Sequence, residues 1–297
     1  MSNIIEVKNV TKDYGQGKGI FDVNITVKKG EVFGFLGPNG AGKTTTIRNL
    51  LGFIRPDKGQ CFIGGLDCFK YAAKIQENLG YLPGEIAFLD DLTGKQMLEF
   101  IASMKGIRDK SKMNDLIERF ELDPKGKIKK MSKGMKQKIG IICAFMGDPD
   151  IIILDEPTSG LDPLMQNRFV DLILEEKNKG KTILMSSHIF EEVERTCDRT
   201  AIIKEGKIVA IERMESLKAK KRKFYSLEFQ SENERLRFQE DNPFIKIIEV
   251  HGRSATVAVQ GDIVKFLDIL TKYKIKDLDV KRETLEEIFL HFYGGDK

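Results

Sequence analysis

The strongest constraint on this chain is a glycine-rich stretch at residues 37–45, which reads Gly37-Pro38-Asn39-Gly40-Ala41-Gly42-Lys43-Thr44-Thr45. It matches the whole pattern G-x-x-x-x-G-K-[ST], in which a glycine backbone wraps around a polyphosphate with its N–H groups pointing inward. The apolar run at 31–36 before it is typical of a buried strand, and the segment after it is typical of a helix whose N-terminus favours anions. The sequence therefore predicts a nucleoside triphosphate site.

Two side chains of this stretch carry the expected chemistry. Lys43 would reach the β- and γ-phosphates, and the Thr44 hydroxyl would bind Mg²⁺. A glycine-rich turn without a ligand is the alternative, because a chain with 27 glycines matches the pattern by chance at a small rate. Independent motifs must decide between the two.

A second motif follows more than a hundred residues later. Residues 150–156 form a continuous apolar strand pattern that ends in Asp155 and Glu156. Open parallel sheets bind their ligands at the carboxyl ends of their strands, so both carboxylates are expected at such an edge. Asp155 is suited to hold Mg²⁺ through its water shell, which leaves Glu156 free to act as a base. Alone, the pair would also fit two acids that end a strand in solvent.

Two weaker signals surround these carboxylates. Ser132 is a candidate N-cap with Gly134 two positions later, which predicts a helix start that can receive a phosphate. An apolar strand at 181–187 ends at His188, which could reach a γ-phosphate from the same edge as Asp155. As an isolated residue, His188 would more often be an ordinary loop position.

In this order the motifs resemble the ATP-binding subunit of ABC transporters over about residues 3–215. The resemblance implies that 37–44 is the Walker A motif, that Asp155 and Glu156 belong to Walker B, and that His188 is the switch histidine. It also implies that 131–135 is the signature motif and that 159–162, including Asp162, is the D-loop. Tyr14 matches the aromatic that stacks on adenine in this family, although alone it would fit a strand-end or core aromatic.

Two motifs depart from the family pattern. The signature has Lys133 and Met135 where the family has Gly and Gln, but it keeps Ser132 and Gly134. The family usually has a glutamine near the metal at the position of Gly84, and we expect Glu85 to substitute for it through a water. Both variants are similar to those in the bacterial ABC-2-type subgroup of bacitracin and drug exporters.

The resemblance implies ATP and Mg²⁺ as cofactors and a head-to-tail dimer, formed by two copies or with a close paralogue. Each nucleotide would lie between Walker A of one chain and Ser132 and Gly134 of the other. Glu156 would polarise water, while His188 and Lys43 would stabilise the transferring phosphoryl group. Hydrolysis would drive a separate transmembrane permease through the 84–130 region.

Two other functions remain open at this point. A soluble ABC-type ATPase that acts on ribosomes or nucleic acid is the main alternative, although this chain has one Walker A motif and only a short insertion. An NTP-dependent switch such as a GTPase would leave Ser132, Gly134 and His188 unexplained. The net charge of +4 gives no argument for nucleic acid as a partner.

Composition predicts a cytoplasmic protein at the inner face of the cell membrane, held there only through its permease. No run approaches the ~20 apolar residues of a membrane span, and the first residues lack the pattern of a signal peptide. The four cysteines have no metal-binding spacing and are expected to be buried free thiols in a reducing compartment.

Changes in hydrophobic period predict the domain organisation. Residues 1–217 are expected to form an α/β P-loop core of ABC type, with antiparallel strands at 4–10 and 21–27 and a helical subdomain at about 84–148. A hairpin at 200–211 would close this domain. Residues 218–297 are expected to form a small accessory α+β domain, a candidate for the ferredoxin-like fold, whose last helix spans 284–293.

Overall fold

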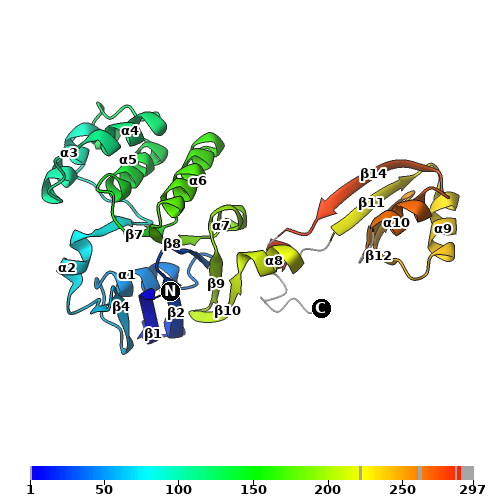
Figure 1. Ribbon diagram of the computed structural model, residues 1–297, viewed down its shortest axis with the longest axis horizontal. Helices are drawn as coiled ribbons and strands as arrows, with labels where there is room; N and C mark the ends of the chain where they lie inside the picture. Colours follow the sequence, from blue (N-terminus) through cyan, green and yellow to red (C-terminus); the bar gives the residue numbers. More distant parts are fainter. Residues whose placement is uncertain (1, 221–222, 260–262, 285, 289–297) are drawn as a thin grey trace. The chain divides into compact units, whose positions relative to one another are not determined.

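A computed structural model of the protein describes residues 2–220, 223–259, 263–284 and 286–288 (Figure 1). The chain divides into two compact units, Met1–Met214 and Glu215–Lys297. The boundary expected from the sequence, after residue 217, falls within helix α8 (Met214–Lys220). The N-terminal unit contains all of the motifs discussed above.

A six-stranded sheet forms the centre of the N-terminal unit, with strand order β10-β9-β3-β8-β7-β6. Neighbouring strands run parallel except β10, which is antiparallel to β9. The strands are β3 (Val32–Leu36), β6 (Leu79–Leu82), β7 (Ile151–Asp155), β8 (Thr182–Ser187), β9 (Arg199–Lys204) and β10 (Lys207–Arg213). The predicted buried strands and the β9–β10 hairpin are confirmed.

The central strands of this sheet are buried along nearly their whole length. Every residue of β3 and β8 is buried, as expected for parallel strands covered on both faces. Leu36 pairs with Ser187, and Asp155 pairs with Ser186. The sheet therefore brings the ends of β3, β7 and β8 to one edge, where the motif residues follow.

A second, four-stranded sheet has the order β2-β1-β4-β5, and all of its pairs are antiparallel. Its strands are β1 (Asn3–Asp13), β2 (Gly19–Lys28), β4 (Lys58–Ile63) and β5 (Leu66–Asp67). The predicted pairing of the first two is confirmed. The sequence analysis missed β4 and β5, because β4 begins with three exposed residues and β5 has only two.

Helices fill the remainder of the N-terminal unit, as listed here: α1 (Lys43–Leu50), α2 (Ala72–Glu77), α3 (Gly94–Met104), α4 (Ser111–Arg119), η1 (Ile128–Lys130), α5 (Lys133–Phe145), α6 (Pro163–Asn178) and α7 (Phe190–Thr196). The predicted helical segment corresponds to α3, α4 and α5, which lie together in Figure 1. A capping box between Thr93 and Gln96 fixes the start of α3.

The C-terminal unit is a four-stranded antiparallel sheet with two helices. After α8 its elements are β11 (Lys223–Phe229), α9 (Glu232–Asp241), β12 (Lys246–His251), β13 (Ser254–Ala258), α10 (Ile263–Leu270) and β14 (Ile275–Arg282). The β-α-β-β-α-β series with order β12-β13-β11-β14 is the ferredoxin-like arrangement, which confirms that prediction. Most of the predicted helix at 284–293 lies outside the described residues.

Two general predictions can be compared with this fold. The four cysteines are free, and three are buried, but Cys143 is only partly buried, which differs from the prediction. The reason is its position on α5 at the lining of a surface groove. In the described part of the chain, no helix combines the length and the apolar character needed to cross a membrane.

Candidate active site

The glycine-rich loop between β3 and α1 is built so that only glycine fits at key positions. Gly40 and Gly42 have φ of +80° and +112°, in the region that favours glycine. A Cβ on Gly37 would lie 2.5 Å from the Ile203 carbonyl oxygen, and one on Gly42 would lie 2.6 Å from Ile20. At Gly37 and Gly42 the loop backbone therefore packs so closely against β9 and β2 that a side chain would not fit.

The remaining residues of the loop differ in their exposure to solvent. Pro38, Asn39 and Gly40 are exposed at the tip, whereas Ala41 is buried. Thr45 belongs to α1, whose first turn presents backbone N–H groups toward the loop. The N-terminus of this helix therefore adds its partial positive charge to the loop.

Lys43 holds its ammonium inside the loop. Its side chain is 5% exposed, and Nζ donates hydrogen bonds to the carbonyl oxygens of Gly37 (2.7 Å) and Pro38 (3.1 Å). The same Nζ lies 3.0 Å from Glu156 Oε1. A buried cation with several oxygen partners fits the oxygens of a phosphate chain, so the residues present fit ATP.

Thr44 and Asp155 come together although they are far apart in the sequence. The Thr44 hydroxyl donates a hydrogen bond of 2.8 Å to Asp155 Oδ2, and the Ser186 hydroxyl donates one to Asp155 Oδ1. Asp155 is fully buried at the end of β7. A hydroxyl and a carboxylate oxygen are ligands that Mg²⁺ prefers, so this donor set fits the metal.

Glu156 and His188 form a contact pair at the same sheet edge. His188 Nδ1 lies 2.5 Å from Glu156 Oε2. Glu156 has φ of +49°, which is uncommon for a residue with a side chain, and its N–H donates to the Ser186 carbonyl oxygen. This backbone turn after β7 directs the Glu156 carboxylate to both Lys43 and His188.

The signature residues lie against the D-loop of the same chain. The Ser132 hydroxyl caps α5 by accepting from the Met135 N–H, and a Cβ on Gly134 would lie 2.6 Å from the Gly160 carbonyl oxygen. Asp162 caps α6 in the same way. Among the described residues, no hydrogen bond or ion pair joins Ser132 or Gly134 to the loop at 37–45. Within the described residues of one chain, Ser132 and Gly134 therefore do not join the loop at 37–45.

Tyr14 and Glu85 lie on exposed segments. The Tyr14 ring is 54% exposed in the β1–β2 turn, which excludes the core-aromatic alternative. Glu85 is exposed and, in the described part of the structure, has no hydrogen bond or ion pair with Thr44 or Asp155. Gly84 lies closer, because a Cβ there would be 3.1 Å from Asp155 Oδ2.

Two buried polar residues of this site were missed by the sequence analysis. Gln137 Nε2 donates to the carbonyl oxygens of Pro157 (2.7 Å) and Glu156 (3.3 Å), which ties α5 to the segment after β7. Glu192 on α7 accepts hydrogen bonds from the hydroxyls of Thr158 and Ser187. It thus links the segments that follow Glu156 and precede His188. No sequence pattern marks either residue, because their partners come from other elements.

Glu192→Gln is expected to remove a pH dependence of stability. Burial raises the pKa of Glu192 above its ordinary value, although the Thr158 and Ser187 hydroxyls lower it. The folded state then holds this proton more tightly than the unfolded chain does. The stabilisation of the folded state by this bound proton is complete below the ordinary glutamate pKa. It is lost as the pH rises through the raised pKa of Glu192. The urea midpoint of the wild type should fall over that range relative to the variant.

The matched control for this experiment is Glu191→Gln, which changes the exposed neighbour on the same helix. Its midpoint should follow the wild type at every pH. A midpoint difference between wild type and Glu192→Gln that is constant across the pH range would contradict the burial argument.

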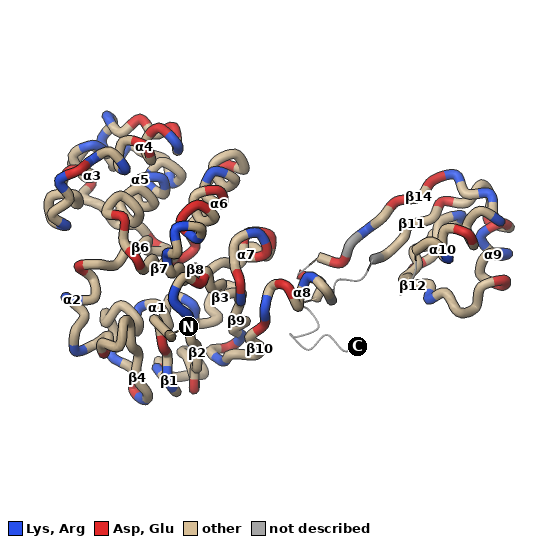
Figure 2. Tube along the Cα trace, in the orientation of Figure 1, with Lys and Arg blue, Asp and Glu red and all other residues tan. Residues whose placement is uncertain are grey.

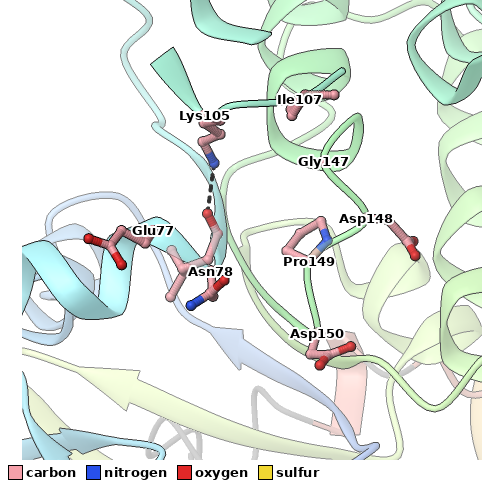
Figure 3. Close-up of a pocket in the computed structure, with 9 residues that line it drawn as sticks. Glu77, Asn78, Lys105, Ile107, Gly147, Asp148, Pro149 and Asp150 are labelled. Atoms are coloured by element: carbon pink, nitrogen blue, oxygen red, sulfur yellow. Dashed lines mark hydrogen bonds between the residues drawn. The ribbon is translucent and has the colours of Figure 1, made fainter. Parts of the chain in front are cut away.

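A polar pocket of about 200 Å³ lies at the opposite edge of the six-stranded sheet (Figure 3). It is lined by the segments at 77–79, 105–107 and 147–150, so it lies at the start of β6 and β7. Lys105 Nζ donates to the Leu79 carbonyl oxygen there. Because ligands of parallel sheets bind at the carboxyl ends of strands, this pocket is not the nucleotide site.

Comparisons with known proteins identify the family of this chain. Residues 20–159 match the family model described as "ABC transporter". The chain is 35% identical to the bacitracin transport ATP-binding protein BcrA of Bacillus licheniformis, over 99% of this chain and 99% of that protein.

Solved structures show the same fold. A structure of the ATP-binding subunit of an ABC transporter matches with a TM-score of 0.66 and 31% identity, over 73% of this chain and 92% of that one. A dimeric bacterial ABC transporter cassette matches with a TM-score of 0.64 and 24% identity, over 71% of this chain and 99% of that one, which concerns the fold alone.

The loop, the two carboxylates and the histidine converge at one sheet edge, and a relative with more than 30% identity covers nearly the whole chain. The chain therefore belongs to the ABC transporter ATP-binding family, whose members hydrolyse ATP to power transport.

Proposed function

We propose that two copies of this chain, or one copy and a close paralogue, bind ATP between them and drive an export permease in the cell membrane. The observation that carries this proposal is the convergence of Lys43, Thr44, Asp155, Glu156 and His188 at one sheet edge. Export is inferred from the likeness to a bacitracin transport protein. The chain would then work at the cytoplasmic face of the membrane, held there by its permease.

Each residue of the edge has a distinct role in this proposal. Bound ATP with Mg²⁺ supplies the reactive γ-phosphoryl group and a cation that neutralises its charge. Lys43 and the N-terminus of α1 hold the phosphate oxygens, while Thr44 and Asp155 hold the metal. Glu156 polarises the attacking water and takes its proton, while Lys43 and His188, which lies 2.5 Å from this carboxylate, stabilise the charge on the transferring phosphoryl group.

The proposal of a dimer is supported by the separation of two motifs within one chain. Ser132 and Gly134 form a helix start suited to phosphate, yet they pack beside Gly160 rather than beside the loop at 37–45. A second chain in a head-to-tail arrangement supplies this element to each site, with Asp162 close to it. Tyr14 stacks on adenine, and Glu85 contacts the metal through a water.

An apolar groove of about 240 Å³ is the proposed docking site for the permease. It is lined by residues of α3, α5, β6 and the segment after α1, including Ile101, Tyr81 and Phe53. Phe53 is 52% exposed and packs edge-on against Tyr81. Pro83 lines the groove and precedes Gly84, where a Cβ would lie 3.1 Å from Asp155 Oδ2. We therefore propose that a permease segment in the groove acts on the Asp155 carboxylate through this part of the chain. Residues 218–297 are proposed to form an accessory domain with a regulatory or dimer-stabilising role.

Phe53→Glu is expected to abolish co-purification with the permease and to leave basal ATP hydrolysis unchanged. A carboxylate in the groove must be desolvated when an apolar partner binds, which costs several kcal/mol. The measurement is a pull-down from detergent-solubilised membranes, together with an ATPase assay. Val209→Glu, which adds the same charge at an exposed position of β10, is the control. Normal co-purification of Phe53→Glu would exclude this groove.

A further inference from the structure

Strand β8 ends in two serines, although its centre is apolar. Residues 183–185 are Ile, Leu and Met, and every residue of the strand is buried. Figure 2 shows charged residues along α4, α6 and α7, whereas β8 contains none. Burying a hydroxyl is costly unless it forms hydrogen bonds. The hydrogen-bond partners of Ser186 and Ser187 therefore indicate what the two serines contribute.

The Ser186 hydroxyl forms hydrogen bonds to both residues of the carboxylate pair that follows β7. Its O–H donates to Asp155 Oδ1, and its oxygen accepts from the Glu156 N–H at 3.1 Å. The Ser186 side chain is 0% exposed. Because a hydroxyl has a single proton to donate, this proton is committed to Asp155. Ser186 thus joins the Asp155 carboxylate to the backbone of Glu156.

The Asp155 carboxylate is held at both of its oxygens. Thr44 donates to Oδ2 at 2.8 Å, and Ser186 donates to Oδ1. Thr44 is itself a proposed ligand of the metal, whereas Ser186 contacts only the carboxylate and the Glu156 N–H among these site residues. A hydrogen bond to the outer side of a metal-binding carboxylate fixes its orientation. The Ser186 hydroxyl is placed to do this for Asp155.

Ser187 provides a comparison within the same strand. Successive side chains of a strand point to opposite faces, and the Ser187 hydroxyl donates to Glu192 Oε2 at 3.1 Å. Within the described residues, no hydrogen bond joins the Ser187 side chain to Asp155 or Glu156. Ser187 is 1% exposed, so the two serines are equally buried but have different partners.

We propose that Ser186 is a positioning residue for the Mg²⁺ site. Its hydroxyl holds the Asp155 carboxylate in the orientation that binds the metal, and the bond from the Glu156 N–H ties the backbone of the base to this carboxylate. Ser186 acts through Asp155 and not on the nucleotide itself. The inference rests on the proposed function, in which Asp155 holds Mg²⁺ and Glu156 acts on water.

The test measures ADP affinity by calorimetry, once with Mg²⁺ and once with EDTA. Because ADP is not the hydrolysed substrate, the ratio of the two affinities reports only how much the metal strengthens nucleotide binding. Ser186→Ala is expected to lower this ratio by about tenfold, as removal of an outer hydrogen bond to a metal ligand does, and to keep the affinity in EDTA. Ser186→Val also removes the hydroxyl but fills its space with a residue that suits a strand, and it should give the same result.

Ser187→Ala is the matched control, because it removes an equally buried hydroxyl one position further along the strand. Its affinity ratio should equal that of the wild type. A wild-type ratio near one would contradict the proposed metal role of Thr44 and Asp155, and with it this inference. A wild-type ratio retained by Ser186→Ala and Ser186→Val would overturn the role of Ser186 alone. Equal losses of ADP affinity with Mg²⁺ and with EDTA would also overturn it, because they would reflect a purely structural role.

Discussion

Glu156→Gln is expected to lower ATP hydrolysis by about 10²- to 10⁴-fold while ATP remains bound. Glutamine keeps the size and the hydrogen-bonding shape of the side chain, but it cannot take the proton of water. Lys43, Thr44 and Asp155, which hold phosphate and metal, are unchanged. Steady-state phosphate release and calorimetric ATP binding measure the two effects separately.

The control for this variant is Glu118→Gln, at an exposed position of α4 far along the chain from the site. It should hydrolyse ATP at the wild-type rate. Hydrolysis by Glu156→Gln at that same rate would remove Glu156 from the role of general base, and a loss of ATP binding would show that it holds ligand instead.

Lys43→Ala is expected to lower ATP affinity by about 10²- to 10⁴-fold. The ammonium makes hydrogen bonds to charged phosphate oxygens, each worth about 1.5–3 kcal/mol, and no other cation of the loop at 37–45 replaces it. Calorimetric titration with ATP and Mg²⁺ gives the affinity. Unchanged affinity would contradict the phosphate-loop assignment.

The folding of Lys43→Ala requires its own control, because Lys43 is buried and its Nζ holds two loop carbonyl groups. Lys95→Ala on α3 removes an exposed lysine and should keep both affinity and melting temperature. A Lys43→Ala chain that melts cooperatively, without tight ATP binding, separates the ligand role from a structural one.

The sequence predicts that the site residues gather at one edge of the six-stranded sheet, because a single physical rule determines their position. Parallel strands end at a common edge. The residues that follow β3, β7 and β8 therefore lie close to one another. The hydrogen bond between Thr44 and Asp155 is the direct result of this rule. Strand patterns and glycine spacing are local in sequence, and they therefore suffice to predict which residues meet at this edge.

The remaining features depend on contacts that no local pattern encodes. The Thr158 hydroxyl donates a hydrogen bond to Glu192 because α7 packs against the sheet edge. No sequence pattern near residue 192 predicts this partner. The approach of Gly84 to Asp155 follows from the path of the chain after β6, which a single residue type does not fix. Such pairings appear only when the fold is known.

The central claim is that each nucleotide site takes its phosphate loop from one chain and its Ser132–Gly134 helix start from another. Mixing two inactive variants tests it most directly. Lys43→Ala removes the loop cation, and Ser132→Arg blocks the second helix start, so each variant alone should be inactive. A mixed dimer contains one intact site, formed by Lys43 of the Ser132→Arg chain and Ser132 of the Lys43→Ala chain. Mixing is therefore expected to restore ATP hydrolysis, and a mixture as inactive as its components would contradict the shared-site mechanism.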